Sequence, residues 1–426
     1  NTSTYVPDDN FEQTLIDLGY DNVLDDYVTT SSIDTITFLY TQNSNISDLT
    51  GIEDFTALTY LRCEGNQITS INISNNTALT KLYCHNNQYT NINISNNTAL
   101  TVLICGSNQL TSLDVSNNTA LTYLTVSSNQ LTSLDVSNNI ALIGLNLGYN
   151  QLTNIDLSNN TALMSFSIYD SPITQIDVSQ NTALTSIWIG DPCLGVCGGS
   201  VPLVSLDVSN CTALTELICY DCDLTSLDVS NNPALTRLDC QNNQLTNLNV
   251  SNNPALTRLH CQNNQLTNLD VRNGNNQLTT NYNFQVTGNP ALSCISVDDT
   301  SWSTANWTNI DAQQFFSNVC QGGFGCTDSL ACNYDSSAII ENGNCVYQGN
   351  TPILECWETA IFDTPTCTWL VAGSQSTSTT NITVCDSYSW NSSTYLASGS
   401  YNWVGTDSNG CDSLAILNLT INSSTS

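Results

Sequence analysis

The stretch LTVLICGSNQLTSLDVSNNTA, residues 100–120, is one copy of a phrase that recurs along most of the chain. Its leading leucine returns every 21 residues, and after one longer gap the same spacing resumes. These leucines are Leu58, Leu79, Leu100, Leu121, Leu142, Leu163, Leu184, Leu214, Leu235 and Leu256. Repetition of one short unit at a constant period predicts a solenoid, in which each coil packs only on its neighbours.

The repeated unit fits the consensus of leucine-rich repeats. The first full copy reads Leu58-x-x-Leu61-x-Cys63-x-x-Asn66-x-Ile68, which matches L-x-x-L-x-L-x-x-N-x-L with cysteine in the third apolar slot. The match extends roughly from residue 36 to residue 292. We therefore predict a leucine-rich-repeat solenoid with a parallel β-sheet.

Alternation within each copy predicts which side chains are buried. Leu61 and Cys63 should point into the coil, whereas Tyr60, Arg62 and Glu64 should point out, because successive side chains of a strand face opposite sides. Strands of successive coils should stack about 4.8 Å apart. A 21-residue coil leaves no room for a long helix on the opposite wall, where we expect short extended or turn-like segments.

One asparagine recurs in the turn that follows each strand. Its amide can satisfy backbone groups of a turn that would otherwise be buried without a partner, so a structural role is predicted. The members of this ladder are Asn66, Asn87, Asn108, Asn129, Asn150, Asn243 and Asn264.

The two ends of the solenoid should be covered. Residues 1–35 are expected to form a helical cap, because residues 7–18 combine early acidic residues with helical apolar spacing and Gly19 can end the helix. The solenoid proper should span residues 36–320, with an insertion at 190–200. It should end in an aromatic cap closed by a Cys294–Cys320 disulfide. The aromatic residues of that cap are Trp302, Trp307, Phe315 and Phe316.

Short cysteine-bearing modules follow the solenoid. Residues 321–347 form a Cys-rich module, and residues 348–374 a small module with paired cysteines. Residues 375–426 contain a linker and a β-sandwich-like module whose alternation is typical of strands.

Composition narrows the class of protein. The net charge of −32, from 5 Lys and Arg against 37 Asp and Glu, argues against a nucleic-acid binder. Nineteen cysteines indicate export to an oxidising environment. The start at Asn1, without Met or an apolar leader, is read as a mature N-terminus. No apolar run reaches the length of a membrane span.

The chain also resembles a family. The repeats, the opening VPDDNFEQTLIDLGYD, the module GCTDSLACNYD with ENGNC, and the module VCDSYSW with GCDSLAILNLTI are similar to those of secreted surface proteins of marine Bacteroidota. The resemblance implies a large adhesin exported by the type IX system. Such proteins usually end in a sorting domain, which this sequence lacks before Ser426, so we expect either a longer protein or another mode of attachment.

The outward strand positions form a candidate partner-binding surface. Aromatic residues beside arginine are typical of binding patches, although any exposed sheet also favours aromatic and β-branched residues. We select ten residues, Tyr60, Arg62, Tyr83, His85, Tyr123, Trp188, Tyr220, Arg237, Arg258 and His260, and note Lys81, Ile104, Tyr169 and Ile218 on the same face.

Two acidic features are candidates for calcium. Aspartates recur at one position of the opposite wall, where a solvated acidic stripe is the favoured interpretation; they are Asp114, Asp135, Asp156, Asp177, Asp207, Asp228 and Asp270. A better oxygen cage lies in the Cys-rich module, where turn formation by Asn and Asp is the alternative; its members are Asp328, Asn333, Asp335, Glu341 and Asn344. We expect no required cofactor.

The cysteines divide into two groups. Six in the buried apolar slot should stay reduced: Cys63, Cys84, Cys105, Cys219, Cys240 and Cys261. Cys193 and Cys197 of the insertion, with Cys211 and Cys222, should form a stapled loop, a four-cysteine zinc knot being the alternative. Further disulfide cysteines are Cys326, Cys332, Cys345, Cys356, Cys367, Cys385 and Cys411.

The sequence contains no nucleophile motif or phosphate loop, so we expect no enzyme. The favoured function is an extracellular, cell-surface adhesion or recognition protein that binds a protein or glycan through the exposed sheet face. A subunit of a surface appendage, contacting copies of itself, is the alternative, and an accessory module of a secreted enzyme is the third hypothesis.

Overall fold

The computed structural model describes residues 2–190, 201–275, 282–318, 320, 323–325, 331, 338–341, 358–363, 368–373, 377–406 and 412–422. The chain divides into two compact units, Asn1–Cys320 and Gln321–Ser426. Among the described residues, no helix has the length and apolarity needed to cross a membrane.

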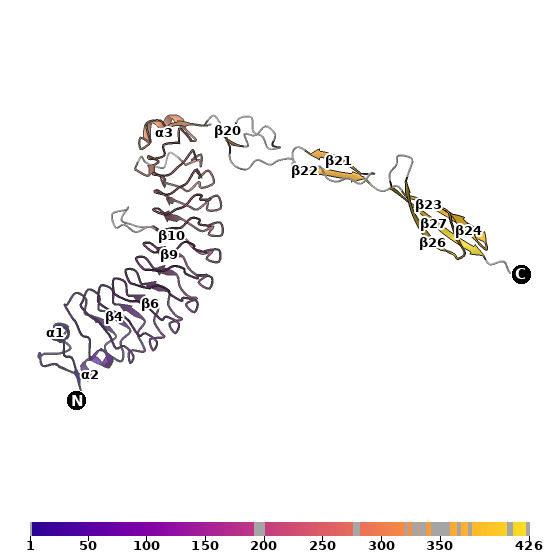
Figure 1. Cartoon of the computed structure of the whole chain (residues 1–426). Helices are drawn as coiled ribbons and strands as arrows, with labels where there is room; N and C mark the ends of the chain where they lie inside the picture. The colour runs from indigo at the N-terminus through magenta and orange to yellow at the C-terminus, as the bar shows by residue number, and fades with distance from the viewer. Residues whose placement is uncertain are drawn as a thin grey trace. The chain divides into compact units, whose positions relative to one another are not determined.

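The first unit is a leucine-rich-repeat solenoid, which confirms the predicted fold. One short strand from each coil joins a twelve-stranded sheet in which every neighbouring pair is parallel (Figure 1). The strands are β3 (Phe38–Tyr40), β4 (Tyr60–Arg62), β5 (Lys81–Tyr83), β6 (Val102–Ile104), β7 (Tyr123–Thr125), β8 (Gly144–Asn146), β9 (Ser165–Ile168), β10 (Ser186–Ile189), β11 (Glu216–Cys219), β12 (Arg237–Asp239), β14 (Arg258–His260) and β16 (Phe284–Gln285).

The core fills the space between this sheet and the opposite wall of each coil. Leu61 and Cys63 are fully buried from the strand side, and Ile73 is buried from the wall side. That wall is built from turns in most coils, as a 21-residue unit requires. In the last coils it becomes a second parallel sheet, formed by β13 (Asn247–Asn249), β15 (Asn268–Asp270), β17 (Cys294–Ser296) and β18 (Phe315–Ser317).

A small cap covers the N-terminal end. It contains an antiparallel pair, β1 (Ser3–Tyr5) with β2 (Tyr27–Thr29), and the helices α1 (Asp9–Asp17) and α2 (Thr30–Ile33). A 3-10 turn, η1 (Ile52–Asp54), follows in the first coil. Asp8 is the N-cap of α1: one carboxylate oxygen accepts hydrogen bonds from the backbone N–H groups of Asn10 and Phe11. Its other oxygen accepts from the Ser47 N–H, which ties the cap to the first coil.

The C-terminal end is covered by aromatic residues, as predicted. The ring of Trp307 stacks on Phe284 at 4.0 Å and contacts Trp302 and Phe316 at 5.6 and 5.7 Å. The Cys294–Cys320 disulfide is present, with an S–S distance of 2.11 Å. The sequence did not predict helix α3 (Thr300–Asn306), although Asp299 caps it by accepting from the Trp302 N–H.

Two asparagine ladders hold the coils together. In the predicted ladder, the Asn87 amide donates to the carbonyls of Cys63 and Cys84 at 2.9 and 3.2 Å and accepts from the N–H of Ile68. A second ladder, which the sequence analysis missed, lies in the opposite wall and is completely buried. There Asn139 donates to the carbonyls of Val115 and Asn118 in the preceding coil at 3.0 and 2.9 Å. Its members are Asn76, Asn97, Asn118, Asn139, Asn160, Asn181, Asn232 and Asn253.

The second unit is built from short sheets. Its pairs are β19 (Gly323–Gly325) with β20 (Ala338–Glu341), β21 (Glu358–Asp363) with β22 (Thr368–Gly373), and β24 (Tyr388–Trp390) with β25 (Ser393–Tyr395). A three-stranded sheet has the order β23 (Thr377–Cys385), β27 (Asp412–Asn422) and β26 (Gly399–Thr406), with β23 parallel to β27.

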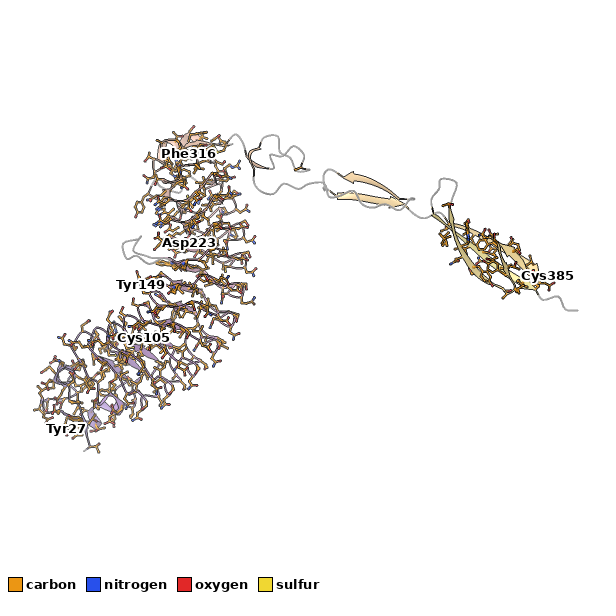
Figure 2. The ribbon with its side chains drawn as sticks, viewed as in Figure 1. Tyr27, Cys105, Tyr149, Asp223, Phe316 and Cys385 are labelled. Atoms are coloured by element: carbon orange, nitrogen blue, oxygen red, sulfur yellow. A yellow bond between two sulfur atoms is a disulfide. The ribbon has the colours of Figure 1, made fainter. Side chains whose placement is uncertain are left out.

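Three of the expected disulfide cysteines are free thiols. Cys385 is exposed and aligned with Asn422, at the end of β27 far from its start at Asp412, which the sequence places directly after Cys411 (Figure 2). The ten residue steps from Asp412 to Asn422 span about 33 Å of strand, so Cys385 lies far from the start of β27.

Cys211 and Cys222 are also free and buried, which corrects the expected staple. Each takes the place of a ladder asparagine, Cys211 in the turn of the opposite wall and Cys222 in the turn after the strand. The two thiols therefore serve as buried turn residues on different sides of the coil. Cys193, Cys197, Cys326, Cys332, Cys345, Cys356, Cys367 and Cys411 lie outside the described residues.

The second ladder yields a stability prediction. Asn139→Ala should lower the free energy of unfolding by about 1–3 kcal/mol, because two buried carbonyls lose their donor. Its exposed neighbour provides the control: the Asn138 amide also donates to the preceding coil, to the Ser116 carbonyl at 3.3 Å, but in contact with water, so Asn138→Ala should change stability by no more than about 0.5 kcal/mol. Urea unfolding of the full chain, followed by circular dichroism, measures both. Equal effects would show that the buried amide does not tie the coils.

Candidate binding surface

The outward side chains of the twelve-stranded sheet, together with the residues directly after each strand, form what we call the strand face. Parallel register places equivalent residues of successive coils side by side, as for Tyr60, Lys81 and Val102. The face has three sections that differ in charge: β3–β5, β6–β10, and the four strands β11, β12, β14 and β16.

The first section, β3–β5, combines aromatic rings with charge. The Tyr60 ring lies 5.8, 5.7 and 5.5 Å from the rings of Phe38, Tyr40 and Tyr83. The Lys81 ammonium lies 6.0 Å from the Tyr60 ring centre.

Arg62 lies beside this aromatic row. Its guanidinium is 5.5 Å from the ring centre of Tyr83 and forms an ion pair with Glu64, whose own side chain is buried. His85, two residues after the end of β5, is half-buried. The predicted residues Tyr60, Arg62 and Tyr83 are thus brought together.

Sequence reasoning missed two residues of this section. Phe38 and Tyr40, on β3, are 54% and 45% exposed and extend the aromatic row. Their strand precedes the first full repeat, and Leu39 stands 22 residues before Leu61 instead of 21. The alternation around Leu39 was the signal that could have identified them.

The third section is built around one buried carboxylate on β12. Asp239 is 1% exposed and accepts hydrogen bonds from Arg237 at 2.6 Å and from Arg258 at 2.9 Å. The Arg237 guanidinium also lies 5.8 Å from the Trp188 ring centre. Both arginines were selected as partner-binding residues, but each already holds an internal partner.

His260 belongs to this buried cluster, so the expectation that it is exposed is wrong. Its Nδ1 lies 3.8 Å from the Asp239 carboxylate, and its Nε2 lies 3.1 Å from the Tyr282 carbonyl oxygen. Burial lowers the pKa of His260 below 6.5, against the opposing effect of Asp239. The imidazole is therefore neutral at pH 7, and it contacts groups of this buried cluster instead of a partner.

Tyr220 and Ile218 are also buried, at 8% and 2% exposure, which corrects their assignment to the exposed face. Arg237 reaches from β12 to Trp188 on β10 and so covers β11, the strand of Ile218. Beside Tyr220, the glycine at position 190 lets the preceding coil approach closely. A Cβ atom at that glycine would lie 1.7 Å from the Tyr220 carbonyl oxygen.

The middle section, β6–β10, is hollowed. A trough of about 550 Å³ extends across it from Lys81 and Tyr83 to Ser167. A second hollow of about 330 Å³ shares Asn146, Ser165 and Ser167 with it and ends at Trp188. We call the two together the central trough. Tyr123 and Trp188 are 48% and 39% exposed along it.

The buried cysteines are not reactive groups. Burial raises the pKa of Cys63, Cys105 and Cys261 to about 12, and it also raises the pKa of Cys84, Cys219 and Cys240 well above the usual range of a thiol. All six are free and buried, which confirms the prediction (Figure 2 marks Cys105). Over the described part of the chain, no three His, Cys, Asp or Glu side chains are grouped to hold a metal ion.

The acidic stripe consists of turn residues. The carboxylate of Asp135 accepts from the backbone N–H of Ser137 at 2.9 Å, and Asp114, Asp156, Asp177, Asp207 and Asp228 do the same with the serine two residues later. Of the expected calcium cage, Asp328, Asn333, Asp335 and Asn344 lie outside the described residues, and of Glu341 only the backbone in β20 is described.

Comparisons with known proteins agree with the fold. No protein-family model matches the chain. Internalin J of Listeria monocytogenes is 38% identical over 72 residues, which are 17% of this chain and 8% of that protein. The chain thus matches less than a tenth of the length of this relative.

Two internalin structures are similar. The crystal structure of internalin InlF from Listeria monocytogenes is 25% identical, with a TM-score of 0.52, and the match covers 72% of this chain and 95% of that chain. The functional domain of InlJ from the same species, which includes a cysteine ladder, is 24% identical with a TM-score of 0.43 and 99% coverage of both chains.

The acidic stripe predicts a pH dependence. Hydrogen bonds from the Ser137 hydroxyl and then its N–H lower the pKa of Asp135 below 3.8, and Asp114, Asp156, Asp177 and Asp207 behave alike. Because these pKa values are depressed on folding, the stability they contribute is present above about pH 4 and is lost as the pH falls through the folded values. The melting temperature of the chain should therefore fall below about pH 4.

A variant with all five aspartates replaced by Asn isolates this effect. Asn93, at the equivalent position, already accepts from the Ser95 N–H at 3.1 Å, so Asn keeps the turn. The variant should show a shallower decline of melting temperature from about pH 5 to about pH 3. A decline as steep as that of the parent chain would assign the acid sensitivity to other groups.

Proposed function

We propose that this chain is an extracellular, non-enzymatic recognition protein that holds a partner against its strand face. The observation that carries the proposal is the exposure of aromatic side chains along one continuous sheet face, including Phe38, Tyr123 and Trp188. Large rings left in water on a rigid surface provide contact area at little cost in conformational entropy. The similarity to internalins supports a leucine-rich-repeat binding protein.

The three sections suit a partner with mixed chemistry. The first section offers rings beside Lys81 and Arg62, and the third offers two arginines fixed on Asp239. Pre-paired arginines are held in one geometry before a partner arrives, which lowers the entropic cost of binding. The central trough lies between them.

Export supports this function. The Cys294–Cys320 disulfide belongs to an oxidising compartment, and the net charge of −32 favours solubility outside the cell. We retain type IX export from a marine Bacteroidota cell as part of the proposal, on the opening sequence and the downstream modules.

The appendage hypothesis is less well supported. Growth by end-to-end stacking needs open solenoid ends, whereas α1 with its β-pair covers one end and the aromatic cap around Trp307 covers the other. We therefore expect the full chain to remain monomeric in dilute solution.

Attachment of beads that carry the full chain to whole bacterial and epithelial cells tests the proposal. The double variant Tyr123→Ala with Trp188→Ala should reduce attachment about tenfold or more, because both rings are exposed and neither fills the core. Pretreatment of the cells with trypsin or with periodate distinguishes a protein partner from a glycan.

The matched control lies outside the strand face. Phe315→Ala removes a ring that is 56% exposed on β18, in the second sheet, and should leave attachment unchanged. Full attachment by the folded double variant, or equal loss with Phe315→Ala, would remove the strand face as the binding surface.

A further inference from the structure

The central trough carries one formal charge, the Lys81 ammonium at its β5 edge, and none along β6–β10. Along β6–β10, every outward side chain is neutral, from Val102 on the first of these strands to Trp188 on the last. The neighbouring sections are charged at the same positions, by Arg62 and Lys81 on one side and Arg237 on the other. In a chain with a net charge of −32, this neutral surface is a local property of the trough.

Two glycines set the aromatic rings in the trough. A Cβ atom at Gly144 would lie 2.7 Å from a ring carbon of Tyr123, and one at Gly148 would lie 2.1 Å from the ring of Tyr169. Each ring thus leans over the adjacent strand, into space that any other residue would fill. The Asn146 amide also donates to the Tyr169 hydroxyl at 3.3 Å.

The floor between the rings is polar but uncharged. Asn146, Ser165, Ser167 and Ser186 line it, and their hydroxyl and amide groups can donate and accept hydrogen bonds. Such a lining suits a ligand that offers hydroxyl groups and carries no charge. An anionic ligand lying along β6–β10 would lose hydration without gaining a cationic partner on these strands, because the Lys81 ammonium lies only at the β5 edge.

We propose that the central trough binds an uncharged, linear β-1,4-linked polysaccharide lying across strands β6–β10. This inference rests on the proposed recognition function and names the class of its partner. The C–H faces of equatorially linked sugars can pack on Tyr123, Tyr169 and Trp188, while their hydroxyl groups meet the floor. Such a chain repeats at a spacing close to that of the strands, which is about 4.8 Å, so one sugar unit can face each coil.

Isothermal titration of the full chain with cellohexaose, mannohexaose and chitohexaose tests the assignment. We expect at least one to bind, and Tyr123→Ala or Trp188→Ala to weaken that binding about tenfold each. Tyr123→Phe should retain it, because the ring remains. Gly144→Ala should weaken it, because the new methyl group displaces the Tyr123 ring. Tyr5→Ala is the control, since Tyr5 is also 48% exposed but lies in the N-terminal cap.

Charge provides an independent readout. If cellohexaose binds, hydroxyethyl cellulose should retard the chain in affinity electrophoresis, whereas carboxymethyl cellulose, which has the same backbone with added carboxylates, should not. Binding should be unchanged between about 0.1 and about 1 M NaCl, where the Debye length falls from about 10 to about 3 Å. A steep loss of binding with salt would assign recognition to the charged sections and overturn the proposal.

Failure of the inference is distinct from failure of the proposed function. If no hexasaccharide binds, while cell attachment still depends on Tyr123 and Trp188 and is abolished by trypsin, the partner is a protein and only the polysaccharide assignment falls. If a hexasaccharide binds equally to the parent chain and to the double variant, the trough is not its site.

Discussion

The solenoid depends on asparagine amides that tie each coil to the coil before it. Most strands of the main sheet are three residues long, and backbone hydrogen bonds between coils continue on either side of them, as from the Asn86 N–H to the Gly106 carbonyl. Asn87 adds a bond to Cys63 of the preceding coil on the strand side, and Asn139 adds two such bonds in the opposite wall. Because both walls are fixed, successive strands keep their register, and the strand face becomes a regular array of side chains.

Positions at which the asparagine ladders lack an asparagine lie close to the proposed binding surface. Ser171 replaces a ladder asparagine after β9 and still donates to the Asn150 carbonyl at 3.3 Å. In the next described coil, Cys211 and Cys222 replace asparagines of both ladders, and neither thiol can donate as an amide does. The spacing between Leu184 and Leu214 also lengthens to 30 residues. A stretch where the repeat loses its regular residues and spacing is typical of a functional region, and this stretch adjoins Trp188.

The sequence predicted features that depend on period and missed those that depend on neighbours. The coil, the buried thiols and the Cys294–Cys320 bond follow from spacing and alternation, which one chain contains in full. Burial of Tyr220 and His260 could not be predicted, because it arises from contacts between coils. The free Cys385 was missed because β23 pairs with β27 in parallel, so its neighbour is Asn422. The uncharged surface of β6–β10 could have been predicted, because the outward positions of these strands form a run of uncharged residues in the sequence.

Free thiols and a disulfide coexist in this chain because burial makes the thiols of the ladder unreactive. Thiol exchange requires a thiolate, and a pKa of about 12 for Cys63 or Cys105 leaves about one thiol in 10⁵ ionised at pH 7. Both are also fully buried, so an external oxidant cannot reach them while the coils stay closed. Export into an oxidising environment is therefore compatible with a ladder of reduced cysteines, and Cys385, which is exposed, is the described thiol on which such an environment would act first.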